Sequence, residues 1–144
     1  MQVFVPYLNP FYTAQALDKR RLNKQIIEAR QIFRAMRGPS EPWHNHPIVK
    51  MWFRYQFWLS FYLLCLEKYR DGQIEEARAL GHNCEMKCNR PEWLTKSLCV
   101  QHRRRLFTKD PKNYGQWARY GTSEENWYYT QEGKFLCYIN GKRV

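Results

Sequence analysis

Residues 17–37, LDKRRLNKQIIEARQIFRAMR, combine an apolar stripe with a line of charged side chains. The apolar residues of this stretch recur at alternating spacings of four and three: Leu22, Ile26, Ala29, Phe33 and Met36. This spacing keeps side chains on one face of a helix. The stretch therefore predicts one helix from Leu17 to Arg37, with this face in the protein core.

A line of polar residues runs along the edge of the same predicted stripe. Arg21, Gln25 and Glu28 fall on this line, and Lys24 lies one step further toward solvent. We therefore expect Glu28 to be half-buried beside cations. Burial would raise its pKa and the cations would lower it. An ordinary solvated surface pair is the alternative to a catalytic carboxylate, because Lys/Glu pairs four residues apart on a helix are common.

Composition favours a single domain with a nucleic-acid partner. The chain has 144 residues, 44% of them apolar, which suffices for one hydrophobic core. Its 24 Lys and Arg against 13 Asp and Glu give a net charge of +11. Such an excess favours a polyanionic partner, and nucleic acid over a membrane. The aromatic content of 17% can serve base stacking or simply fill the core.

The cysteines and the N-terminus indicate an intracellular protein, in the cytoplasm or nucleus or encoded by a virus. MQVFVPYLNPF has no secretory signal pattern. Five cysteines, an odd number, favour reduced thiols over a disulfide framework. The most apolar window, residues 51–66, contains Arg54 and is shorter than the ~20 residues of a membrane span. We therefore expect no contact with a membrane.

Start and stop signals divide the rest of the chain into mainly helical elements. An extended arm reaches Pro10, with Asn9 or Thr13 as the cap of the following helix, which ends at Gly38-Pro39. Further helices are predicted at 47–72, 73–80 and 91–108. From Trp127, the alternating sequence WYYTQEGKFLCYI around Gly133 indicates a small β-hairpin.

Three groups of side chains are candidates for function. Basic residues gather at 19–24, with Arg30 and Arg34, and again at 103–105 with Lys109, where they can bind phosphate or form a solvated face. The histidines of WHNHP, residues 43–47, can contact phosphate, transfer protons or order the loop.

A zinc site is the third candidate. Its ligands would be Cys84, Cys88, Cys99 and His102, with His82 as a spare. Because the Cys-x3-Cys spacing is at the edge of common zinc patterns, free thiols are the default. We expect neither a metal nor a cofactor.

Five separated motifs carry a family resemblance. MQVFVPY, LDKRRLNKQIIEARQI, WHNHPIVKMW, PEWL and HRRRLFTKDPKNYGQW together resemble the pyrimidine-dimer DNA glycosylase family, the endonuclease V type found in phages and some viruses and bacteria. The resemblance covers most of residues 1–117 in order, and the tail from Ala118 is extra. It implies an all-α fold, compact and single-domain, over residues 1–144.

The resemblance also implies a reaction. In this family an N-terminal α-amine attacks the sugar C1′ of the damaged nucleotide, a Schiff base forms, and β-elimination nicks the strand. The family's catalytic glutamate corresponds to Glu28. An α-amine suits this role, because its reference pKa of about 8 leaves more of it neutral at pH 7 than a lysine.

The N-terminus departs from the family pattern. The best-known members expose a threonine followed by an arginine after the methionine is removed, whereas here Gln2 is bulky and Val3 follows it. We therefore expect the methionine to be retained and its amine to be the nucleophile, with Lys24 as the substitute. The candidate catalytic residues are Glu28, Met1, Gln2 and Lys24.

The expected substrate is double-stranded DNA containing damaged pyrimidines or abasic sites, bound by a monomer. The candidate DNA-binding residues come from both basic groups and the histidine motif: Arg20, Arg21, Gln25, Arg30, His44, His46, His102, Arg103, Arg104 and Lys109. Two alternatives are a non-catalytic nucleic-acid-binding module, zinc-stabilised or not, and a glycosylase for another modified base.

Overall fold

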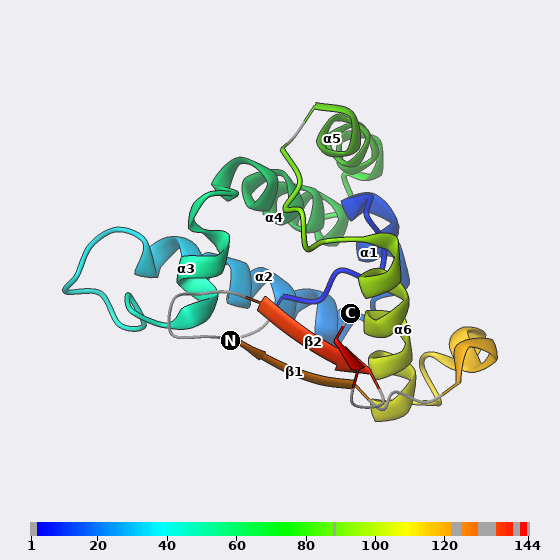
Figure 1. Cartoon of the computed structure of the whole chain (residues 1–144). Helices are drawn as coiled ribbons and strands as arrows, with labels where there is room; N and C mark the ends of the chain where they lie inside the picture. The colour runs from blue at the N-terminus through cyan, green and yellow to red at the C-terminus, as the bar shows by residue number, and fades with distance from the viewer. Residues whose placement is uncertain (1–2, 88, 122–124, 130–134, 140–141, 144) are drawn as a thin grey trace.

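Helices form most of the computed structural model, which describes residues 3–87, 89–121, 125–129, 135–139 and 142–143 (Figure 1). The side chains described are those of 3–86 and 89–121. In chain order the helices are α1 Pro10–Ala16, α2 Lys19–Ala35, α3 Pro47–Phe53, α4 Gln56–Arg70, α5 Ile74–Lys87, α6 Lys96–Lys109 and the 3-10 helix η1 Gly115–Tyr120. The predicted all-α class is confirmed.

The predicted first helix is in fact preceded by a separate short one. Asn9 caps α1 by accepting a hydrogen bond from Phe11 N–H, so the predicted cap is confirmed at Asn9, whereas Thr13 lies inside the helix. Leu17 is extended and ends α1, and Asp18 then caps α2 by accepting from Arg21 N–H. The helix predicted from Leu17 to Arg37 was therefore two residues too long at each end.

The buried face of α2 follows the predicted stripe. Leu22, Ile26 and Ala29 are buried, while Phe33 and Met36 are partly buried at the edge of the core. Ile32 and Ala35 complete the buried face. This face packs against α4, which also contacts α1 and α5.

The predicted long element from Pro47 to Gly72 is broken into α3 and α4. Arg54 and Tyr55 separate the two helices, and the backbone of Tyr55 is not helical. The break lets Trp52 of α3 stack on Trp58 of α4, with ring centroids 5.7 Å apart. The predicted stop at Gly72 is confirmed, because this residue has a φ of 79°, which favours glycine.

The helix predicted at 73–80, with Gly81 as its stop, instead continues to Lys87. Gly81 lies against α1: a Cβ added there would be 2.9 Å from the backbone nitrogen of Phe11. Glycine is therefore required here by the close approach of α1, and not as a helix stop.

The C-terminal part begins with α6, which Thr95 caps by accepting from Leu98 N–H. The sequence placed its start at Pro91, five residues before Lys96, and η1 was not predicted. The strands β1 Glu125–Tyr129 and β2 Phe135–Ile139 pair antiparallel in the predicted hairpin, and β3 Lys142–Arg143 pairs with β2. Gly133 lies outside the described residues.

Figure 1 shows that different elements lie on the two sides of the molecule. The loop between α2 and α3 projects from one side of the molecule, and α6 with η1 occupies the opposite side. The arm before α1 passes between them. None of the described helices has the length and apolar character that crossing a membrane requires.

Gly81→Ala tests the close approach of α1 and α5. We expect a loss of stability of about 1–3 kcal/mol from overpacking, although alanine is the better helix former by about 1 kcal/mol. Gly38→Ala is the matched control, because nothing lies within 4 Å of a Cβ there. Urea unfolding of both variants measures the difference, and equal stability of Gly81→Ala and the parent would contradict the packing.

Candidate active site

The N-terminal arm is held in the core by hydrogen bonds to its backbone. Phe4 N–H donates to Gln25 Oε1 over 2.8 Å, and the Tyr62 hydroxyl donates to Phe4 O over 2.8 Å. The same hydroxyl lies 3.2 Å from Gln25 Oε1. Burial raises the pKa of Tyr62, so this hydroxyl keeps its proton. Residues of α2 and α4 therefore fix the arm at Phe4.

A second pair of contacts, from α6, fixes the next residues. Val5 N–H donates to His102 Nδ1 over 2.7 Å, and Arg103 Nη1 donates to Pro6 O over 2.7 Å. Burial lowers the pKa of His102 to about 3. The ring is therefore neutral, and since its Nδ1 accepts the Val5 proton, its own proton is on Nε2. The arm thus runs between α2 and α6.

Glu28 lies on the same helix as the Gln25 contact, one turn further on. It is half-buried, as the sequence predicts, and Lys24 one turn before it is exposed. The remaining two candidate catalytic residues, Met1 and Gln2, lie outside the described residues. Glu28 is therefore three residues along α2 from the Gln25 contact that holds Phe4, and Phe4 is three residues after the first residue of the chain.

Cations from α2 and α6 gather near this arm. Burial lowers the pKa of Lys109, and the positive charges of Arg105, Lys24 and Arg21 lower it further. The Lys109 ammonium also lies 5.2 Å from the centroid of the Phe4 ring. These four residues, Arg21, Lys24, Arg105 and Lys109, form what we call the α2–α6 cation cluster.

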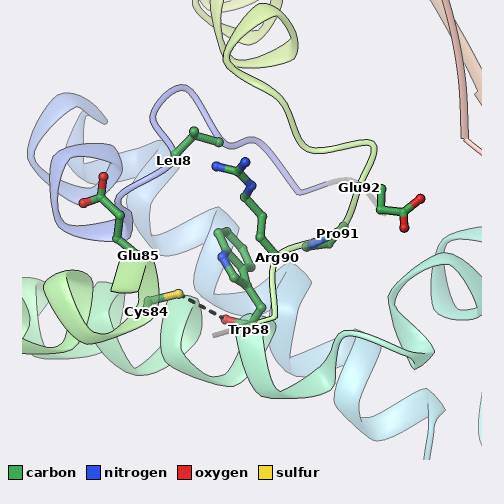
Figure 2. Close-up of a pocket in the computed structure, with 7 residues that line it drawn as sticks. All are labelled: Leu8, Trp58, Cys84, Glu85, Arg90, Pro91 and Glu92. Atoms are coloured by element: carbon green, nitrogen blue, oxygen red, sulfur yellow. Dashed lines mark hydrogen bonds between the residues drawn. The ribbon is translucent and has the colours of Figure 1, made fainter. Parts of the chain in front are cut away.

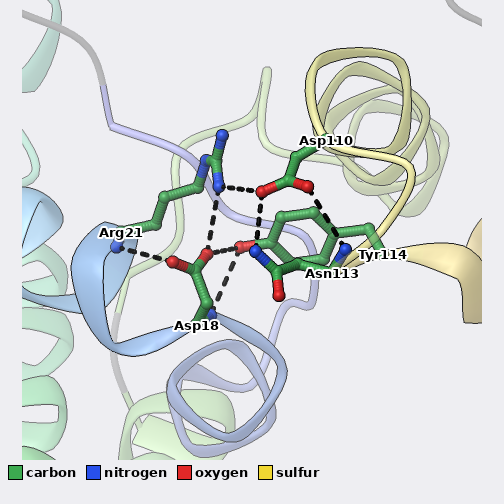
Figure 3. A network of polar contacts seen from close by, with 5 residues as sticks. All are labelled: Asp18, Arg21, Asp110, Asn113 and Tyr114. Atoms are coloured by element: carbon green, nitrogen blue, oxygen red, sulfur yellow. Dashed lines mark hydrogen bonds and ion pairs between the residues drawn. The ribbon is translucent and has the colours of Figure 1, made fainter.

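Arg21 also holds the fold together through the network in Figure 3. Its Nη1 donates to Asp110 over 2.8 Å and to Asp18 over 3.2 Å. The Tyr114 hydroxyl donates to Asp18. Burial acts to raise the pKa of Asp18, but these bonds from Tyr114 and Arg21 hold it below its usual range. Arg21, which the sequence predicts to contact DNA, therefore also connects α2 to the segment after α6.

The other candidates on α2 lie in different environments. Arg20 is exposed. Gln25 is only 3% exposed and its Oε1 accepts the Phe4 N–H, and its contact with DNA stays a prediction. Arg30 is bound to Glu67 of α4, with Nη2 3.1 Å from the carboxylate. Of these candidates, Arg20 and the neighbouring Lys24 therefore present exposed charges on α2 for which no ion pair with a described carboxylate is seen.

The candidate DNA-binding residues on α6 also differ in exposure and in the contacts they make. His102 is 3% exposed and its Nδ1 accepts the Val5 N–H, and its contact with DNA stays a prediction. The guanidinium of Arg103 lies over the Tyr7 ring at 4.6 Å and over the Tyr120 ring at 5.0 Å. Arg104 is half-buried, and its buried Nε has no hydrogen-bond partner among the described residues. Lys109 is exposed and belongs to the cation cluster.

The histidines of WHNHP order the loop between α2 and α3, one of the roles the sequence allowed. His44 Nδ1 lies 2.7 Å from Ala35 O, so this nitrogen carries a proton and donates it. His46 Nδ1 instead accepts from Ile48 N–H over 3.1 Å and caps α3. Burial lowers the pKa of His46, which keeps it neutral for this role.

The described cysteines among the candidate zinc ligands do not form a metal site. Cys84 and Cys99 are buried, and Cys88 lies outside the described residues. Burial raises the pKa of Cys99 to about 12, and His102 Nδ1 is bound to the arm. Across the described part of the chain, no group of three or more His, Cys, Asp or Glu could hold a metal.

A pocket that the sequence did not suggest lies where the arm meets α4 and α5 (Figure 2). It has a volume of about 420 Å³ and is lined by Leu8, Trp58, Cys84, Glu85, Arg90, Pro91 and Glu92. Among the residues that the structure describes, none of the predicted catalytic or DNA-binding ones lines it. The pocket is therefore separate from the Glu28 side of the arm.

Sequence reasoning did not predict the role of Tyr62. The signal was its hydroxyl, because a buried tyrosine needs a hydrogen-bond partner. Nothing in the sequence indicates that this partner is Phe4 O, 58 residues away.

Comparison with known proteins identifies the family. Neither curated proteins nor solved structures give a match to the chain. The family model for pyrimidine dimer DNA glycosylase matches residues 1–90, which is 90 of 144 residues. The match includes the arm, Gln25, Glu28 and Tyr62, and ends before α6. The chain therefore belongs to the pyrimidine dimer DNA glycosylase family of DNA-repair enzymes.

Proposed function

We propose that this protein excises damaged pyrimidines from duplex DNA and cleaves the resulting abasic site through a Schiff base. The observation that carries the proposal is the anchored arm: Phe4 is bound to Gln25, one helical turn before Glu28. Family membership supports the glycosylase step. The lyase step and the identity of the nucleophile go beyond what family membership supports.

Chain geometry supports the α-amine of Met1 as the nucleophile. Three residues separate the chain start from Phe4, and such a segment spans at most about 10 Å. Glu28 is three residues after Gln25, a rise of about 4.5 Å along α2. The amine can therefore reach the carboxylate from the anchored position of Phe4. This nearness supplies the orientation that an intramolecular reaction needs.

The proposed reaction has two steps in which Glu28 acts. The neutral amine attacks C1′, a nitrogen–carbon bond forms, and the glycosidic bond breaks with its electron pair leaving on the base. Glu28 stabilises the positive charge that develops on the sugar. After the ring opens to a protonated Schiff base, Glu28 removes a proton from C2′ and the C3′–oxygen bond breaks.

Lys24 remains the second candidate for the nucleophile. It is exposed, four residues before Glu28, and therefore on an adjacent turn of the same helix face. It also belongs to the cation cluster, where a role in binding phosphate competes with one in attacking the sugar. The two amines are chemically distinguishable, because only one is at the chain terminus.

The α2–α6 cation cluster supports binding of the DNA backbone beside Glu28. Lys24 and Lys109 come from different helices yet are close enough for one charge to lower the pKa of the other. Phosphate oxygens would relieve this repulsion. Arg20 extends the positive surface along the exposed side of α2.

The salt dependence of DNA affinity tests the cluster. The logarithm of affinity should fall linearly with the logarithm of salt concentration, and Lys24→Ala and Lys109→Ala should each lower this slope by about 0.9. Lys68→Ala is the control, because its ammonium is paired with Glu76 at 3.0 Å. Fluorescence anisotropy measures all four proteins, and an equal change for Lys68→Ala would reject the cluster as the binding surface.

Glu28→Gln tests the carboxylate. Glutamine keeps the size of the side chain but accepts no proton, so strand cleavage should fall by about 10²–10⁴ while DNA affinity stays nearly constant. Cleavage assays on thymine-dimer and abasic duplexes measure this loss. Unimpaired cleavage would show that the catalytic carboxylate lies elsewhere.

Borohydride trapping on an abasic duplex distinguishes the two amines. At saturating DNA, protein acetylated at its N-terminus should form no covalent adduct, whereas Lys24→Ala should form one at nearly the parent rate. The reverse pattern would assign the nucleophile to Lys24. Absence of an adduct with the unmodified protein would remove the Schiff base from the proposal.

Tyr62→Phe tests whether the anchored arm positions the amine. The change leaves the buried Phe4 O without this donor and should cost about 1–3 kcal/mol in stability. It should also lower the trapping rate at saturating DNA with little change in KM, since Tyr62 is fully buried and contacts no substrate. Tyr12→Phe, on a residue that is 53% exposed, is the control. A parent trapping rate in Tyr62→Phe would separate the arm contact from catalysis.

A further inference from the structure

Trp43, in the loop between α2 and α3, combines high exposure with an uncommon backbone conformation. It is 60% exposed. Its φ is 68°, the left-handed region, and among the described residues other than glycine it alone has a positive φ. Tryptophan rarely adopts this conformation, whereas glycine and asparagine do so readily. Neither core packing nor turn geometry therefore accounts for a tryptophan here.

The loop holds Trp43 in a defined position. Its carbonyl accepts from His46 N–H over 2.8 Å, and its ring contacts the His46 ring with centroids 5.7 Å apart. On the other side, His44 is bound to Ala35 O. Both neighbouring histidines are thus used to fix the loop. A large aromatic ring is presented to solvent from a rigid backbone.

The hydrogen bond from His44 attaches this loop to α2 at Ala35. Ala35, which His44 contacts, is seven residues after Glu28, so it is two turns along the same side of the helix. Two turns correspond to about 10.5 Å, or about three base steps of a DNA strand at 3.4 Å each. The cation cluster lies at the other end of α2. Glu28 is therefore between the phosphate-binding surface and Trp43.

The surroundings of the loop also suit nucleic acid. Arg37 before it and Lys50 in the last turn of α3 are both exposed. An exposed aromatic ring with flanking cations is the combination that binds unpaired bases, because every base has a face on which to stack. Glycosylases require such bases, since the damaged nucleotide must leave the duplex stack before it reacts.

We propose that Trp43 stacks on an unpaired base of the distorted duplex, about three base steps from the nucleotide at Glu28. This inference rests on the proposed function and adds a residue that acts on the duplex instead of on the reacting sugar. Trp43 would stabilise the unstacked state of the DNA. It would have no role where the substrate is already single-stranded.

Trp43→Asn tests this role against a structural one. Asparagine accepts the left-handed backbone, so the thermal midpoint should stay constant or rise by a few degrees. Borohydride trapping on an abasic duplex should nevertheless fall about tenfold, the effect expected for loss of one base-stacking ring. Trapping on the same abasic strand without its complement should stay within about twofold of the parent. Trp43→Phe should recover most of the duplex activity.

Phe57→Ala is the matched control, because Phe57 is also 60% exposed and lies on α4. It should trap the duplex at the parent rate. Parent-like trapping by Trp43→Asn on the duplex, or an equal loss on the single strand, would overturn the stacking role. Failure of the parent protein to trap either substrate would instead contradict the proposed function.

The position of the unpaired base gives a second readout. Duplexes carrying 2-aminopurine at one to five steps from an abasic analogue should show a change in emission that is largest about three steps away. This change should be lost in Trp43→Asn and retained in Phe57→Ala. A response that is the same in all three proteins would overturn the assignment of the base to Trp43.

Discussion

The hydrogen bonds that hold the N-terminal arm in the core are the constraint on which the site depends. The arm has no helical or strand pairing there, so its buried N–H and C=O groups need side-chain partners. Gln25, Tyr62 and His102 supply them from three different helices. Burial fixes the proton positions, because it raises the pKa of Tyr62 and lowers that of His102. These hydrogen bonds therefore hold the arm on its path past α2.

Anchoring the arm would achieve little if α2 and α6 could shift relative to each other. Arg21 and Asp110 join the start of α2 to the end of α6, and Asp18 with Tyr114 closes the same network. Each carboxylate has a depressed pKa, so the ties persist well below neutral pH. The arm and the network thus fix the same pair of helices from two sides. As a result, Glu28 and the cation cluster keep fixed positions relative to each other.

The sequence predicted features that depend on local periodicity and missed those that depend on distant contacts. The core face of α2 and the half-burial of Glu28 follow from spacing along one helix, and both are present. Gly81 was misassigned as a stop because its real constraint is Phe11 of α1. Gln25 and His102 were assigned to DNA because each stands beside cations in the sequence. Their contacts are with Phe4 and Val5, which no local pattern indicates.

Charge balance links this architecture to DNA binding. The cluster contains four cations, and the Arg21 network contributes two carboxylates, Asp18 and Asp110, which leaves an excess of two positive charges. Burial lowers the pKa of Lys109 most, and the positive charges of Arg105, Lys24 and Arg21 lower it further, so part of this repulsion remains in the folded protein. A phosphate placed there would remove the repulsion and favour the charged form of Lys109. Binding of DNA should therefore also stabilise α2 and α6 relative to each other, the two helices whose Gln25 and His102 hold the arm.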